Sequence, residues 1–309
     1  MLVKAADGRQ ADIDILTSIL DRPGLAADTR ARIETELRQI RAGAAGERDA
    51  AYEIEFHYAA NPNRMTIHDL RLEVDGRVAQ IDHLLVDRLV GIWICESKHF
   101  SEGVAVDEFG EWTGFYRRRQ YGIGSPIEQN RKHAAVLNDV FATGLIKPPT
   151  RLGLPIKPTI RSLVLISTGA RISRPKTAAA RTRIDGLESV IKVDQLKCLL
   201  DKELDAKGVM AMTRFISQGE VERLARELAA LHRPITVDWT ARFGVPDAPA
   251  PAEPVPSATA GPTVCQACGK RVSQAVIDFC QSRSEIFGGR TLCIDCQRLA
   301  RKARLSPSS

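Results

Sequence analysis

The spacing of apolar residues predicts helices and strands that alternate along the chain. Ile33, Leu37, Ile40 and Ala44 recur at three- and four-residue steps, which predicts a helix over residues 27–58. The other predicted elements are strands over 65–74, 77–86 and 90–98, a hairpin over 103–116, a helix over 126–141, a strand over 160–167, and helices over 194–206 and 218–231. This order predicts an α/β fold in which helices flank a mixed β-sheet.

The chain also divides into regions of different composition. Residues 246–262, PDAPAPAEPVPSATAGP, are rich in Pro and Ala and lack hydrophobic periodicity, which predicts an extended linker. The region that follows, 263–309, is too short to fold on an apolar core alone, so we expect a bound metal to stabilise it. We therefore predict a helical region over 1–40, the mixed-sheet domain over 41–245, the linker, and a small zinc-ribbon-like module at the C-terminus.

Composition indicates a globular protein in a reducing compartment. The chain is 44% hydrophobic and 27% charged, as soluble proteins are. Its first residues lack the basic start and the unbroken apolar run of a signal peptide, and no later stretch is apolar enough for a membrane span. We expect a cytoplasmic protein, in which the isolated thiols of Cys95 and Cys198 pack among apolar neighbours.

Positive charge is concentrated near the C-terminus. The formal net charge is +6, and residues 263–309 hold eight Lys or Arg against three Asp or Glu. A basic module suits a polyanionic partner, DNA first and RNA second, with Lys270 and Arg271 as candidate contacts. A solvated basic tail without a partner is the alternative.

Four cysteines of this region have the spacing of a zinc site. Cys265 and Cys268 form one C-x₂-C pair, and Cys293 and Cys296 form a second. Two such pairs can hold one Zn²⁺ tetrahedrally, and with every position closed by sulfur the zinc is structural rather than catalytic. Cys280 either replaces one ligand or packs as a small apolar residue, and the second role is favoured. The module resembles the C4 zinc modules attached to nucleases and topoisomerases, which implies nucleic-acid binding, with protein contact as the rival.

Three ionisable residues stand on two predicted strands, Asp82 within the first and Glu96 and Lys98 at the end of the second. If residues 88–90 close a hairpin, Asp82 lies directly opposite Glu96, with Cβ atoms roughly 5 Å apart. Lys98 shares the face of Glu96 because side chains alternate along a strand. His83 and His99 fall on the opposite faces by the same rule, so we do not expect them to bind metal.

Two carboxylates at this distance repel each other, and a bound Mg²⁺ or Mn²⁺ makes the arrangement favourable. Asp82 and Glu96 would hold the ion, and the Lys98 ammonium would face developing negative charge on a phosphate. These are the parts of a phosphodiester-cleaving site. A purely structural ion-pair cluster is the alternative.

The same residues resemble a known family. Asp82 followed by Glu96-x-Lys98 is similar to the D…ExK signature of the restriction-endonuclease-like PD-(D/E)xK superfamily. The neighbourhood resembles the nuclease-related domain, NERD, in family order over roughly residues 40–145. The matching residues are Gly46-Glu47, Gln80-Ile81-Asp82-His83, Glu96-x-Lys98, Trp112 and Pro126-x-x-Gln129.

The resemblance implies a catalytic role for each matching polar residue. Glu47 would bring a helix-borne carboxylate to the metal site, and Asp82 and Glu96 would be direct ligands. Lys98 would position or activate water, and Gln129 would orient phosphate or water. Glu47 and Gln129 could instead be ordinary polar helix residues. Many family members have a small polar residue where this chain continues with His99-Phe100, which leaves local specificity open.

A basic and aromatic stretch follows the candidate site. Arg117, Arg118 and Arg119 lie between Tyr116 and Tyr121. Arginine can clamp phosphates and aromatic rings can stack on unpaired bases, although a solvated turn has the same composition. The sequence thus favours a Mg²⁺-dependent nuclease that cleaves DNA and is tethered by a zinc module. The rivals are a catalytically silent nucleic-acid-binding protein and a protein-interaction scaffold.

Overall fold

The computed structural model describes residues 1–206, 214–245 and 264–305, so the predicted linker lies outside the described residues. The chain forms two compact units. The first contains Met1–Ala6 and Asp49–Pro234, and the second contains Asp7–Arg48 and the residues from Ile235 onward. Among the described residues, the helices are all too short or too polar to cross a bilayer.

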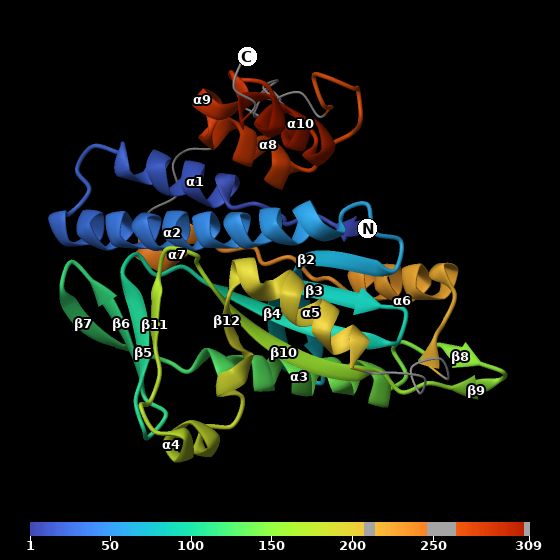
Figure 1. The fold of residues 1–309 in the computed structure, drawn as a ribbon. Helices are drawn as coiled ribbons and strands as arrows, with labels where there is room; N and C mark the ends of the chain where they lie inside the picture. Colours follow the sequence, from blue (N-terminus) through green and yellow to red (C-terminus); the bar gives the residue numbers. More distant parts are fainter. Residues whose placement is uncertain (207–213, 246–263, 306–309) are drawn as a thin grey trace. The chain divides into compact units, whose positions relative to one another are not determined.

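A six-stranded mixed sheet forms the centre of the first unit (Figure 1). Its strands, in spatial order, are β1 (Leu2–Lys4), β2 (Arg64–Val74), β3 (Arg77–Asp87), β4 (Gly91–Lys98), β10 (Thr159–Ile166) and β12 (Val190–Lys192). The β2–β3 and β3–β4 pairs are antiparallel, whereas β1–β2, β4–β10 and β10–β12 are parallel. The predicted mixed sheet is therefore confirmed.

Helices cover both faces of this sheet and form two separate cores. On one face, α3 (Pro126–Ala142) and α6 (Gln218–Ala230) bury the apolar side chains of β2, β3 and β4. On the other face, the last turns of α2 (Ala27–Tyr58) and α5 (Leu196–Asp205) pack on β4 and β10. Strands that are buried on both sides read as nearly continuous apolar runs, and β4, GIWICESK, has that pattern.

A second, four-stranded sheet lies beside the first (Figure 1). Its order is β11 (Arg171–Ser173), β5 (Gly103–Val106), β6 (Trp112–Tyr116) and β7 (Arg119–Ile123). A third core joins this sheet to the first one, because Val104 and Trp112 pack with Ile127 of α3 and with Val164 of β10. The shorter elements of this unit include β8 (Thr150–Arg151), β9 (Leu154–Pro155) and α4 (Ala178–Arg183).

The alternation of strand side chains breaks where the candidate site begins. Ile67 and Leu70 of β2 belong to the same core, although an unbroken strand would point them to opposite faces. Between them, Asp69 has a φ of 51°, in the left-handed region. The pairs on either side place Asp69 opposite Asp82 of β3. The sheet is therefore locally irregular at Asp82.

The second unit contains a helical cluster and the cysteine module. In the cluster, α1 (Gln10–Leu20), the first part of α2 and α7 (Trp239–Phe243) bury Leu16, Ile33 and Trp239 together. In the module, the helices are α8 (Gln274–Ser282), α9 (Ser284–Phe287) and α10 (Ile294–Leu305). The module has its own small core, which includes Phe279 and Phe287.

Candidate active site

The hairpin of β3 and β4 positions the two acidic residues. Its turn consists of Arg88–Val90, as the sequence predicted, and Asp87 closes it by accepting the amides of Leu89 and Gly91 at 2.8 and 2.9 Å. The register that pairs His83 with Cys95 brings Asp82 to the level of Glu96.

Two polar side chains hold Glu96 by hydrogen bonds and are also hydrogen-bonded to each other. Its Oε1 accepts from the Lys98 ammonium at 2.7 Å and from the Gln129 amide at 2.7 Å. The Lys98 ammonium also donates to Gln129 Oε1, at 3.1 Å. Glu96 is 2% exposed, so this carboxylate is taken out of water and fixed by its neighbours. The structure thus brings together three residues that the sequence separates by up to 33 positions.

Asp82 is fixed by a residue that strand alternation had placed on the other face. Its Oδ2 accepts from both the backbone amide and the hydroxyl of Ser97, each at 2.8 Å. The irregularity at Asp82 and Asp69 explains why alternation failed here. Ser97 therefore orients the first carboxylate of the site, which the sequence did not indicate.

Burial and mutual repulsion shift the titration of the two carboxyl groups. Burial, followed by the Asp82 carboxylate, raises the pKa of Glu96 to about 7 against the opposing effects of Lys98 and Gln129. Burial also raises the pKa of Asp82, although the two hydrogen bonds from Ser97 oppose the rise. Both carboxyl groups thus lie in surroundings that favour the protonated form, and a cation between them would reverse that preference.

His133 was missed by sequence reasoning. It lies one turn after Gln129 on α3, and its Nδ1 is 3.9 Å from Glu96 Oε2. Burial, followed by the Lys98 ammonium, lowers the pKa of His133 to about 4, so the ring is neutral near pH 7. The i, i+4 spacing from Gln129 is the signal that could have identified it.

The donor set fits a divalent cation. Glu96 Oε2 is buried and accepts no hydrogen bond from the described part of the chain. Asp82 uses Oδ2 and Glu96 uses Oε1 in the hydrogen bonds described above. Each side chain therefore has a second carboxylate oxygen. Carboxylate oxygens are the ligands that Mg²⁺ prefers. Asp82 and Glu96 are therefore the residues that would hold it.

The structure also positions the other residues that the sequence analysis considered. Glu47 lies on the part of α2 that belongs to the second unit. His83 is buried on the far face of β3, where its Nδ1 is 2.8 Å from Nδ1 of His68, and His99 is exposed after β4. Arg117–Arg119 lie at the exposed end of the β6–β7 hairpin.

The cysteine module gathers its four predicted ligands. The sulfur atoms of Cys265, Cys268, Cys293 and Cys296 all lie within 4.8 Å of one another, as a zinc site requires. Burial raises the pKa of Cys265, but backbone amides that include that of Cys293 outweigh it and lower the pKa to about 6. A thiol that ionises easily is a ready zinc ligand.

The remaining cysteines have structural or surface positions. Cys280 is buried outside the four-sulfur group, where it accepts from the Leu292 amide at 3.4 Å and from the fully buried Gln297 at 3.3 Å. This agrees with the favoured packing role. Cys95 is buried as expected, but Cys198 is exposed on α5, so the expectation that it packs was wrong.

The two basic residues proposed as DNA contacts in the module have different settings. Lys270 is exposed and pairs with Asp295 at 3.0 Å, so the Asp295 carboxylate offsets part of the positive charge that Lys270 would offer to a ligand. Arg271 is exposed and its backbone pairs with Val264 in an isolated bridge.

A comparison with protein families identifies a family that this part of the chain resembles. Residues 42–167 match the family model of the nuclease-related domain, NERD. This stretch, the NERD segment, is similar to nuclease-related domains. The match confirms the resemblance seen in the sequence, and the NERD segment includes Asp82, Glu96, Lys98 and Gln129. No curated protein and no solved structure matches the chain.

Proposed function

We propose that this protein is a metal-dependent nuclease that hydrolyses phosphodiester bonds of DNA, with Mg²⁺ or Mn²⁺ held by Asp82 and Glu96. The observation that carries the proposal is the buried Glu96 carboxylate, bound on Oε1 by Lys98 and Gln129 and without a hydrogen-bond partner on Oε2 in the described residues. Burying a carboxylate is costly without function or a partner charge. The NERD match supports a nuclease-related role.

Each side chain has a chemical task in this proposal. When bound, the ion would polarise a phosphate oxygen and acidify a water molecule. Ser97 holds Asp82, and Gln129 holds Glu96, so both carboxylates are oriented before substrate arrives. The Lys98 ammonium, 32% exposed, can face the negative charge that develops on phosphorus oxygens. Glu47 stays a candidate for a further acidic group.

The proposal extends to the rest of the chain. The four-cysteine module would hold a structural Zn²⁺ and bind nucleic acid through Lys270, Arg271 and neighbouring basic residues, in the reducing cytoplasm. Tethering it to the nuclease would raise the effective concentration of DNA at the site. RNA as substrate and a protein partner for the module are the alternatives.

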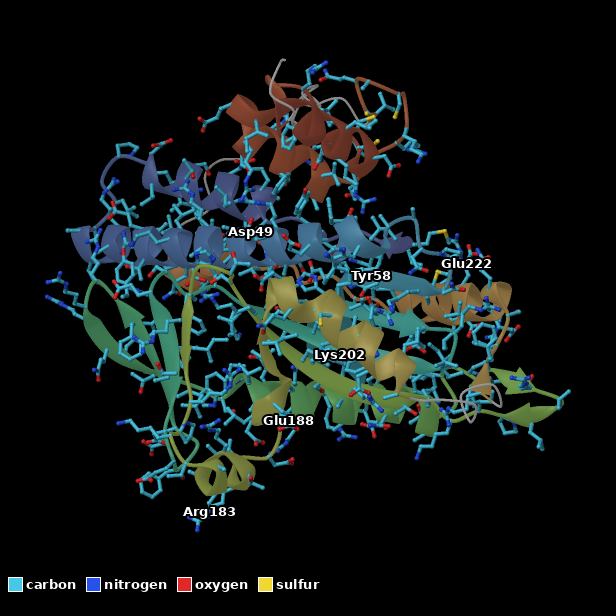
Figure 2. All side chains as sticks on the ribbon, viewed as in Figure 1. Asp49, Tyr58, Arg183, Glu188, Lys202 and Glu222 are labelled. Atoms are coloured by element: carbon cyan, nitrogen blue, oxygen red, sulfur yellow. The ribbon has the colours of Figure 1, made fainter. Side chains whose placement is uncertain are left out.

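The test is a cleavage assay on the full chain with linear, circular and single-stranded DNA, with Mg²⁺, Mn²⁺ or no added divalent cation. We expect cleavage only with a cation, and a loss on the order of 10²–10³-fold or more in Glu96→Ala and Lys98→Ala. Glu188→Ala, which removes an exposed glutamate labelled in Figure 2, is the matched control and should cleave normally.

A second candidate function is a binding protein that keeps the fold without catalysis. It predicts that Glu96→Ala binds DNA as well as the unaltered protein, and that neither cleaves with any cation. Cleavage without a divalent cation, or undiminished cleavage by Glu96→Ala, would contradict the proposed mechanism.

A further inference from the structure

The β6–β7 hairpin carries a surface whose composition is unusual for an exposed turn. Between Trp112 and Ile123 it has three arginines, two tyrosines and no acidic residue. Tyr116 is 51% and Tyr121 is 45% exposed. Exposed aromatic rings on either side of arginines combine a stacking surface with positive charge.

The strand register places the aromatic and basic side chains on one face. Trp112 pairs with Ile123, Gly114 with Tyr121, and Tyr116 with Arg119. Because side chains alternate, these six positions share a face of the hairpin. At the base of that face Trp112 packs in the core with α3, while towards the tip the same face presents Tyr121, Tyr116 and Arg119 to solvent.

Gly114 allows one of the tyrosine rings to lie flat. A Cβ atom at Gly114 would approach Cζ of Tyr121 to 2.6 Å and its hydroxyl oxygen to 2.8 Å. The ring therefore crosses the backbone of β6 directly, with one side covered by the strand and much of the rest exposed. An immobilised ring with an open face can stack on a base without losing further side-chain freedom.

The turn at the tip places two arginines in a left-handed backbone conformation that is strained for such residues. Arg117 and Arg118 have φ values of 49° and 61°, as the two central residues of a type I′ turn do. Asn-Gly is the preferred pair at such positions, and bulky residues there are costly. The guanidinium of Arg117 lies 5.3 Å from the Tyr116 ring centre, and Glu102 accepts the Arg118 amide at 3.3 Å.

The hairpin is joined at its C-terminal end to an element of the candidate active site. β7 leads through Gly124 and Ser125 into α3, whose first turn carries Gln129. Glu102, which holds the tip, follows Lys98 of β4 by four residues. The hairpin and the candidate site therefore belong to the same compact unit and are joined through α3.

We propose that the β6–β7 hairpin binds single-stranded DNA, with Tyr116 and Tyr121 stacking on unpaired bases and Arg117–Arg119 contacting phosphates. This inference deepens the proposed nuclease function, on which it rests, by naming an unpaired strand as the substrate class. Bases in a duplex are stacked on each other and offer no free face to a tyrosine ring, whereas every unpaired base does.

The test measures the affinity of the full chain for a labelled single strand and for the matching duplex, in magnesium-free buffer so that binding is separate from cleavage. We expect tighter binding of the single strand. Tyr121→Leu should weaken single-strand binding about tenfold and leave duplex binding nearly unchanged. Arg183→Gln, on α4 and labelled in Figure 2, is the matched exposed-arginine control and should bind normally.

A double variant, Arg117→Asn with Arg118→Gly, separates binding from folding. It relieves the strained turn, so its unfolding temperature should rise, while its single-strand affinity falls. The slope of log affinity against log salt should decrease by about 1.4, the value for two lost phosphate contacts.

The outcomes distinguish this inference from the nuclease proposal. If the protein cleaves DNA but Tyr121→Leu and the double variant bind single strands normally, the hairpin inference is overturned and the nuclease proposal stands. If single-strand binding depends on the hairpin but no cation supports cleavage, the inference stands and the nuclease proposal fails. Equal affinity of the unaltered protein for duplex and single strand also overturns the inference.

Discussion

At the scale of single residues, Glu96 couples the site to protein stability. The group binds its proton more tightly in the folded chain, because burial raises the pKa from 4.5 to about 7. The folded state of the magnesium-free protein should therefore lose stability as the pH rises from about 4.5 to about 7, by at most about 3 kcal/mol.

Glu96→Gln removes this titration, so its unfolding temperature in magnesium-free buffer should exceed that of the unaltered protein at pH 8 and approach it at pH 4.5. Thermal unfolding followed at several pH values measures the difference. A difference between the two proteins that does not vary with pH would show that burial of the charge is not the cause.

Other residues of the site show what a sequence can and cannot reveal. Asp82, Glu96, Lys98 and Gln129 were found from a motif and its spacing. Ser97 was missed because strand alternation turned it away from Asp82, and that alternation is interrupted where Asp69, with a left-handed backbone, faces Asp82 across the sheet. A φ value at one non-glycine residue is set by tertiary packing, and local sequence does not encode it visibly.

At the scale of secondary structure, α3 links helix stability to the proposed catalytic site. The Ser125 hydroxyl accepts the Glu128 amide at 3.3 Å and caps the helix that carries Gln129. Ser125→Ala should cost about 1 kcal/mol of stability and also lower the cleavage rate, because Gln129 lies in the loosened first turn.

The matched control for this prediction is another helix cap. The Ser217 hydroxyl accepts the Glu220 amide at 3.1 Å at the start of α6, away from the proposed catalytic residues. Ser217→Ala should cost similar stability and leave the cleavage rate unchanged. Thermal unfolding and kcat measured on both variants decide the matter; equal kcat losses in the two variants would mean that the effect on activity is general destabilisation.

The long elements were the predictable ones. The helix over 27–58 is confirmed, and the strands, α3, α5 and α6 agree with their predictions within two residues. The missed elements include β1, β12 and β7, which have three to five residues each. Such short segments contain too few positions for a period to emerge, and the edge strands form through pairing with distant segments.

At the scale of the whole molecule, the cysteine module and the mixed-sheet unit should unfold independently. Each has a core of its own, and the module is too small to remain folded without its metal. A zinc chelator, or Cys293→Ser, should abolish the unfolding transition of the module and leave that of the mixed-sheet unit in place.

Calorimetry and limited proteolysis measure these two transitions. Cys198→Ser, which alters an exposed thiol on α5, is the control and should change neither. A single transition that shifts as a whole on chelation would contradict the prediction.

The extent of the first unit bears on how such a domain could be transplanted. The NERD match over residues 42–167 contains only four of the six strands of the large sheet, since β1 and β12 lie outside it. It also omits α5 and α6 and would start inside α2. A fusion protein built from the matched segment alone would expose two bare sheet edges and uncovered apolar faces, and should aggregate when it is produced.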